Sequence, residues 1–286
     1  MPTMARLECR SAQRGVPSQW VEVNGITDKQ VGRARAHLDK LIAETRQVST
    51  AVASAFVSLT TMCPTANPSD LWQHVIYRHL LAEGWSDNRW KRVSGFALER
   101  ALVILYSPRL LPHRIRMRIL PDLEANQLLD ALGIAGTRAT KVDLFLEGRV
   151  GAHWGVFGAV HVKLSIAERI QDDVPASHAF IERGLVSIAL TMDAKSLPPP
   201  HGDCVNYGEL GGRSLGVEKE RLKRNYVEVA GQFSALFSFN LRTPPSHAET
   251  SSGRRIYTMS LHEEPPDQLV QFLIQSLATH TTGISI

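Results

Sequence analysis

The sequence of 286 residues has no internal repeat, no low-complexity tract and no long apolar run. A membrane-spanning helix needs about 18–20 mostly apolar residues, and no stretch approaches that length. The N-terminal segment, MPTMARLECRSAQRG, is polar and basic without an apolar core, so no secretory signal is expected. These absences argue against a membrane partner and predict a cytoplasmic globular protein.

Cysteine is also scarce. The three cysteines, Cys9, Cys63 and Cys204, are far apart in the chain and odd in number. Disulfide-rich and zinc-binding domains carry paired or closely spaced cysteines instead. The sequence therefore predicts neither a disulfide framework nor a zinc site, which agrees with a reducing cytoplasm.

Positive charge, by contrast, is concentrated in two segments. Residues 86–118 carry eight Lys or Arg against two acids, and residues 213–224 carry five against two, whereas the whole chain has a net charge of only +4. Such segments can bind a polyanion by displacing its counterions. A solvated basic surface explains the charge equally well, so this feature alone does not decide the function.

Helical patterns occupy the first part of the chain. The spacing of apolar residues predicts helices over three segments: 27–59, 67–85 and 94–107. Thr27 and Gln30 form a capping box for the first helix, while Ser69 and Ser94 are the expected N-caps of the second and third.

Strand patterns follow the helices. Alternating or continuous apolar residues predict strands over four segments: 114–120, 141–148, 159–163 and 185–193. A closing helix is expected over 265–280. This order predicts one α/β or mixed α+β domain over 1–286, in which a helical part of about 1–110 packs on a sheet part of about 111–286.

Asp143 and Lys163 fall on the polar faces of two strands expected to lie side by side. Such a pair is most often a cross-strand ion pair, worth a few tenths of a kcal/mol, roughly. In a metal-dependent nuclease the same pair binds Mg²⁺ and orients or deprotonates a water. The usual nuclease pattern has an acid two residues before the lysine, but His161 stands there, so a second carboxylate must come from Glu99, Asp172 or Asp173.

Several longer segments carry a more specific signal. The segments are CPTANPSDLWQHVIYR, KVDLFLE, HVKLSIAERIQDDVPAS, SLPPPHGDCVNYGELG, KRNYVE and FSFNLRTPPS. Together they resemble the type II restriction endonucleases that cut at CCGG, over most of the chain from the helix of Gln73 to Pro245. The chain departs from the family pattern at Val142, where the signature has proline, and at His161.

The resemblance implies the PD-(D/E)XK restriction-endonuclease-like fold, a central mixed β-sheet flanked by helices, with Mg²⁺ as cofactor. It implies that Glu99, Asp143 and Lys163 are catalytic. In this family one catalytic glutamate lies on a helix, and Glu99 matches it. Asp143 and Glu99 would hold the metal, with Asp173 as a further ligand.

The resemblance also implies how DNA is read. Glu168 and Arg169 match the element that contacts neighbouring cytosine and guanine, since a carboxylate accepts from cytosine N4 and an arginine matches guanine O6 and N7. Arg92, seven residues before Glu99, matches a guanine-reading arginine. The second basic segment adds Lys223 and Arg224 as expected DNA contacts.

The sequence thus predicts a type II restriction endonuclease that acts as a homodimer on double-stranded DNA. The resemblance implies the site A^CCGGT, cut after the first base to leave 5′-CCGG ends. Two alternatives stay open: a PD-(D/E)XK nuclease with another role, such as repair, and a sequence-specific DNA-binding protein without catalysis. The first would not need the Glu168–Arg169 pair, and the second would not need the acid–lysine pair.

Overall fold

The structure, a computed structural model, describes residues 3–10, 15–134, 141–166, 170–195, 204–211 and 217–284. A central sheet has six strands in the order β3 (Ile115–Arg118), β4 (Leu144–Val150), β5 (His153–Lys163), β6 (Val186–Thr191), β7 (Ala235–Ser238) and β8 (Ile256–Thr258). β4 runs antiparallel to its neighbours β3 and β5, and β5 to β8 are parallel. The predicted mixed sheet is therefore confirmed.

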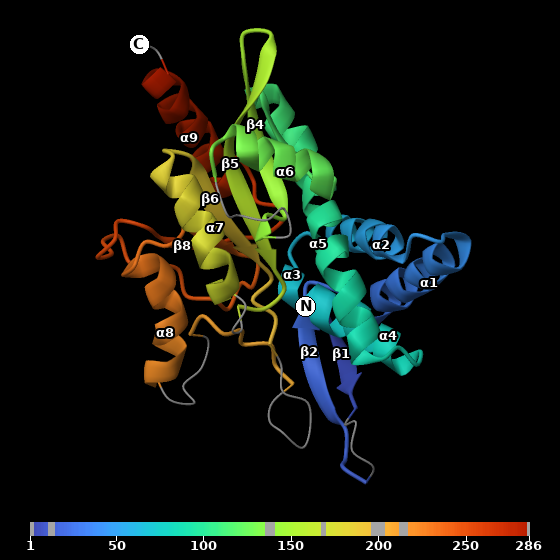
Figure 1. Cartoon of the computed structure of the whole chain (residues 1–286). Helices are drawn as coiled ribbons and strands as arrows, with labels where there is room; N and C mark the ends of the chain where they lie inside the picture. Colours follow the sequence, from blue (N-terminus) through green and yellow to red (C-terminus); the bar gives the residue numbers. More distant parts are fainter. Residues whose placement is uncertain are drawn as a thin grey trace.

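Helices cover both faces of this sheet (Figure 1). On one face pack α5 (Asp87–Leu110) and α9 (Gln268–Ile284), whose buried residues join those of the N-terminal helices in one core. On the other face pack α6 (Asp122–Ala131), α7 (Ile170–Glu182) and α8 (Val217–Glu228), in two smaller buried clusters. The strands alternate between these cores: Val160 and Val162 of β5 face α5, while His161 contacts Phe233 on the opposite side.

The N-terminal part begins with a two-stranded antiparallel hairpin that the sequence patterns did not predict. Its strands are β1 (Met4–Cys9) and β2 (Gln19–Asn24), followed by five helical segments: α1 (Asp28–Glu44), α2 (Val48–Met62), α3 (Pro68–Asp70), the π-helical η1 (Leu71–Tyr77) and α4 (Arg78–Ala82). In Figure 1 this hairpin extends at the foot of the molecule, α2 lies beside α5, and α1 lies beside α2. A short 3₁₀ turn, η2 (Leu111–His113), links α5 to β3.

The long helix predicted over 27–59 is wrong, because the chain breaks between α1 and α2. Thr27 and Gln30 do form the capping box. Thr45 is extended at the end of α1, and its hydroxyl accepts a hydrogen bond from the backbone N–H of Gln47. A local side-chain bond of this kind competes with the helical backbone bond and ends the helix.

Two expected N-caps are also wrong. The cap of the second helical segment is Asn67, whose side chain accepts from the N–H of Ser69. The third helix begins seven residues earlier than expected, because Ser86 caps it by accepting from the N–H of Arg89. Ser94 is instead buried in the interior of α5.

The cysteine pattern was misleading as well. Cys9, at the end of β1, forms a disulfide with Cys204 across 195 residues of sequence. Distance in the sequence does not prevent this contact, because the hairpin folds back beside the loop that contains Cys204. Cys63 is free and buried. Within the described residues, no helix is long and apolar enough to cross a membrane.

Candidate active site

Asp143 and Lys163 meet where β4 begins and β5 ends. The backbone N–H of Asp143 donates to Val160 O over 3.2 Å, which aligns the two strands. Asp143 Oδ2 accepts from the backbone N–H of Val162 at 2.6 Å and lies 3.2 Å from Lys163 Nζ. Sequence alternation thus placed the pair correctly, and the backbone N–H adds an orientation for the carboxylate that no pattern predicts.

Asp173 joins this pair from the first turn of α7. Its Oδ2 lies 2.6 Å from Lys163 Nζ, and the residue is buried, whereas Asp172 is exposed. Burial alone would lower the pKa of Lys163, but the charges of Asp143 and Asp173 raise it above its ordinary value. Lys163 is therefore held as an ammonium between two carboxylates.

Glu99 belongs to the same electrostatic cluster. It lies on α5 and is 8% exposed. Burial and the charge of Asp143 raise the pKa of Glu99, Lys163 and Arg100 oppose the shift, and the resulting pKa is about 7. A positive charge placed beside such a carboxyl group favours its ionised form, and a negative charge favours its protonated form.

The donor chemistry of this cluster fits a divalent cation. Glu99, Asp143 and Asp173 are hard oxygen donors of the kind that Mg²⁺ prefers. Burial raises the pKa of Glu99 most, and repulsion from Asp143 adds to it; a bound dication would relieve this repulsion. Among the described residues, however, no three acidic, histidine or cysteine side chains already converge as a complete ligand set.

His161 occupies the signature position two residues before Lys163. It is fully buried, and burial lowers its pKa to about 4, so the ring is neutral. Nε2 lies 3.1 Å from Ser187 Oγ on β6. Ser187 Oγ also lies 2.7 Å from Ser177 Oγ on α7. The sequence patterns predicted a role for neither serine, although Ser187 is a polar residue inside a buried strand.

The expected DNA-reading residues divide into two groups. Arg92 is exposed on α5, and the seven residues that separate it from Glu99 make two helical turns, so both side chains lie on one side of the helix, about 10 Å apart along the axis. With Ser94 as the N-cap, Arg92 would lie just before the helix; it lies instead within α5, which begins at Asp87. Glu168 and Arg169 lie outside the described residues.

Lys223 and Arg224 of α8 have partners inside the protein. Lys223 Nζ lies 2.9 Å from Glu209 Oε1. Arg224 pairs with Glu228 and also donates to the carbonyls of Leu210 and Pro244. Arg224 thus joins α8 to two loops, a role that its basic surroundings in the sequence do not reveal.

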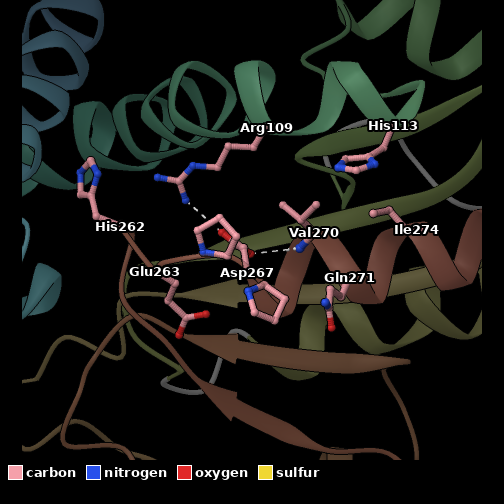
Figure 2. Close-up of a pocket in the computed structure, with 10 residues that line it drawn as sticks. Arg109, His113, His262, Glu263, Asp267, Val270, Gln271 and Ile274 are labelled. Atoms are coloured by element: carbon pink, nitrogen blue, oxygen red, sulfur yellow. Dashed lines mark hydrogen bonds and ion pairs between the residues drawn. The ribbon is translucent and has the colours of Figure 1, made fainter.

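A separate cavity of about 550 Å³ lies between the end of α5 and the start of α9. Figure 2 shows Arg109 on α5 reaching Asp267, with Val270 and Ile274 of α9 on the apolar wall. None of the residues that line it belongs to the cluster of Glu99, Asp143, Lys163 and Asp173, so the cavity and this cluster are separate features.

Both the sequence and the fold of this chain are similar to those of a known enzyme. The chain is 41% identical, over 271 residues, to the type II restriction enzyme AgeI of Thalassovita gelatinovora, covering 90% of this chain and 95% of that enzyme. It also matches the crystal structure of a specific AgeI–DNA complex with a TM-score of 0.85 and 38% identity, over 95% of this chain and 99% of that one. No family model matches the sequence.

Proposed function

Because this chain belongs to the family of the type II restriction enzyme AgeI, we propose that it hydrolyses one phosphodiester in each strand of duplex DNA at a palindrome with a CCGG core. The observation that carries this proposal is the contact of Lys163 with both Asp143 and Asp173. The proposed site is ACCGGT, cut after the first base to leave 5′-CCGG ends. A palindrome cut on both strands calls for two copies related by a two-fold axis, so the active form is a homodimer on DNA.

The metal in this proposal is Mg²⁺, held by Glu99 and Asp143 with Asp173 as a further ligand. When bound, it supplies a Lewis acid that lowers the pKa of water and stabilises charge on the phosphate. Asp143 is held in orientation by the N–H of Val162. Lys163, whose pKa is raised, acts as an ammonium that orients the attacking water and the phosphate oxygen rather than as a base.

Base reading falls to Arg92, Glu168 and Arg169, which match guanine and cytosine edges. Lys223 contributes a phosphate contact. Arg224 is already engaged by three groups, so its part is to hold the loops that flank the DNA. We propose that the helical part of about 1–110 and the sheet part of about 111–286 act as one catalytic unit, and that the enzyme works in the cytoplasm.

A digest tests this function. One linear DNA would carry a single ACCGGT, a second CCGG site with other flanking bases, and a random control region. We expect Mg²⁺-dependent cuts at ACCGGT alone, with both strands ending in 5′-CCGG, and no cut by the Asp143→Ala variant. Cleavage unrelated to CCGG would favour a nuclease with another role, and specific binding without cleavage would favour a DNA-binding protein.

A further inference from the structure

Arg242 contacts a buried carboxylate with only one of its three side-chain nitrogens. Nη1 donates to both oxygens of Asp70, at 2.8 and 2.7 Å; Asp70 is 1% exposed, whereas the Arg242 side chain is 28% exposed. Within the part of the chain that the structure describes, Nε and Nη2 donate to no protein group, and neither nitrogen is a buried atom. A guanidinium has five N–H donors, so three of them remain for a group outside the protein.

Arg224 shows the contrasting case of an arginine whose nitrogens are all engaged within the protein. Its Nε and Nη2 donate to the two oxygens of Glu228, and its Nη1 donates to the carbonyls of Leu210 and Pro244. Such a two-nitrogen fork is the usual geometry of an arginine–carboxylate pair. In Arg242 one nitrogen spans both carboxylate oxygens instead, so the Nε–Nη2 edge of the guanidinium lies on the opposite side of the planar group, away from the carboxylate.

Arg242 lies at the same edge of the sheet as Lys163. Lys163, Thr191 and Ser238 are neighbours in one row across β5, β6 and β7, and the loop that follows β7 leads to Arg242. Neighbouring strands are about 4.8 Å apart, so the end of β7 is about 10 Å from Lys163. Successive phosphates of one DNA strand rise about 3.4 Å along the helix axis. A DNA backbone bound beside Lys163 can therefore present a phosphate a few nucleotides away to this loop.

The loop of Arg242 is held in place before any DNA binds. The Asn240 side chain donates to the carbonyls of Asp193 and Asn206. Its Oδ1 accepts from the backbone N–H of Arg242 at 3.1 Å. Together with the contact to Asp70, these bonds fix the direction of the guanidinium. A group fixed in this way loses little conformational freedom when it binds a partner.

From these contacts we propose that Arg242 donates, through Nε and Nη2, to a phosphate of the DNA backbone near the one that is cut, and that Asp70 holds the guanidinium in that direction. The inference rests on the nuclease function proposed above and adds a backbone contact to its base-reading residues. A phosphate presents two oxygens to this edge of the guanidinium, so the contact is bidentate. If Arg242 only joined its loop to α3 through Asp70, no phosphate of the DNA would depend on it.

Arg242→Lys removes the outward edge of the guanidinium and keeps a cation against Asp70. Arg109 supplies a matched control, because its Nη1 lies 2.9 Å from Asp267, its side chain is 27% exposed, and this pair lines the separate cavity (Figure 2). We expect Arg242→Lys to weaken binding to an ACCGGT duplex in Ca²⁺ by about tenfold, and Arg109→Lys to leave it unchanged. Urea unfolding checks that both variants are folded. Equal affinities of the two variants would overturn the proposal.

A scan of neutral phosphates identifies the contact. Each phosphate of the duplex is replaced in turn, in both strands, by a methylphosphonate, which lacks the negative charge. At one position near the cut, we expect the replacement to cost the wild type and Arg109→Lys about tenfold in affinity, and to cost Arg242→Lys less than about twofold, because that variant has already lost the contact. The absence of such a position would overturn the proposal. A loss in Arg242→Lys that is confined to CCGG duplex and independent of every phosphate would indicate a base contact instead.

A second variant provides the test if Arg242→Lys does not fold. His74, 4.0 Å from Asp70, is neutral because burial lowers its pKa to about 3, so Arg242 is the cation that contacts the Asp70 carboxylate within the described residues. Asp70→Asn/Arg242→Gln removes both charges together and leaves no buried ion unpaired. We expect this double variant to lack the response to the same methylphosphonate. A full tenfold response would overturn the proposal.

Affinity and cleavage measurements keep this inference apart from the proposed function. A wild type that binds the duplex without cutting it would overturn the proposed function, and the phosphate scan would still decide the role of Arg242. If the wild type cuts at ACCGGT and no phosphate depends on Arg242, the function stands and the inference fails. A wild type that binds no duplex would overturn both.

Discussion

Two buried carboxylate sites lie at neighbouring strand ends on one edge of the sheet, and they differ in how their charge is met. At the end of β5, Asp143 and Asp173 share the ammonium of Lys163, and Glu99 beside them has a pKa raised to about 7. After β6, Asp193 is surrounded by neutral donors. Lys163 on β5 and Thr191 on β6 are neighbouring residues in the parallel strand pair. Asp193 follows Thr191 by two residues, so the two sites lie at neighbouring strand ends.

The donors to Asp193 come from two loops. Its Oδ1 accepts from the N–H of Glu209 at 2.6 Å, and its Oδ2 accepts from the Thr243 hydroxyl at 2.7 Å. Gly208 has a φ of +75°, and a Cβ there would lie 2.2 Å from Asp193 Oδ2, so the loop approaches as closely as glycine allows. Burial raises the pKa of Asp193 to about 6, while these donors oppose the shift.

The two sites differ in whether the charge of the carboxylate is met within the protein. The oxygens of Asp193 are satisfied within the protein, and they fix the loops around 204–211 and 240–243. The carboxylates around Lys163 share one contacting ammonium, which leaves negative charge for a cation from solution. Burial and a raised pKa occur at both sites, so neither property alone identifies the catalytic one.

The largest expected effect comes from removing either member of the central pair. Asp143→Ala and Lys163→Ala should each lower cleavage of CCGG duplex by about 10³-fold, which corresponds to about 4 kcal/mol of transition-state stabilisation. Sequence-specific binding in Ca²⁺ should stay measurable, because neither residue reads a base. Single-turnover assays beside gel shifts measure both quantities, and near-wild-type cutting by either variant would refute the catalytic assignment.

A matched pair of acid-to-amide variants tests the comparison itself. Glu99→Gln should bind CCGG duplex and cut poorly, with unfolding free energy equal to or above that of the wild type, because an amide removes the repulsion with Asp143. At pH 7, Asp193→Asn should lose about 1–3 kcal/mol of stability, since an amide turns N–H groups toward donors. It should still cut at a temperature where it is folded. Urea unfolding measures the stability of each variant, and single-turnover assays measure its cleavage rate. A stability loss in Glu99→Gln together with a cleavage loss in folded Asp193→Asn would exchange the two roles.

The difference in stability between the wild type and Asp193→Asn should change with pH in one direction. Folding raises the pKa of Asp193 from 3.8 to about 6, so the folded chain keeps a proton that the unfolded chain has released. The stability from this group is complete below about pH 4 and is lost as the pH rises through about 6. The wild type should therefore lose about 3 kcal/mol relative to Asp193→Asn between about pH 4 and pH 7. A stability difference that does not change with pH would contradict the assigned shift.

The sequence predicted the mixed sheet and the Asp143–Lys163 pair because both follow from local periodicity. It did not predict β7, which is short and buried, or β8, which has three residues and is only partly buried. It also missed the break after Thr45, which depends on one side-chain hydrogen bond. Periodicity also did not show whether Asp172 or Asp173 lies beside Lys163. Only the direction of α7 against β5 distinguishes them, because one side chain faces Lys163 and the other faces solvent.

An intermediate effect is expected from the base-reading residues. Arg169→Ala and Arg92→Ala each remove a guanine contact, and Glu168→Ala removes an acceptor for cytosine, so each should cost about 1–3 kcal/mol of discrimination. Binding to CCGG duplex should fall toward the level of random DNA. Competition gel shifts measure the ratio of the affinity for CCGG duplex to the affinity for random DNA. Equal losses on specific and random DNA for Arg169→Ala would show that this residue contacts only the backbone.

The smallest expected effect belongs to Lys223, and its surroundings supply a matched control. Lys223 and Lys195 both contact Glu209 Oε1, at 2.9 and 2.8 Å, so removing either lysine leaves that buried carboxylate with a partner. Stability should therefore change little in Lys223→Ala and in Lys195→Ala.

The two variants should differ in how their DNA binding depends on salt. If Lys223 contacts a phosphate, Lys223→Ala should weaken binding to specific and random duplex alike and reduce the slope of log affinity against log salt concentration by about 1. Lys195→Ala removes the same charge and a contact to the same carboxylate, so it measures the effect of net charge alone. The phosphate contact requires the larger change of slope in Lys223→Ala. Equal slopes would assign Lys223 to the buried ion pair and not to the DNA.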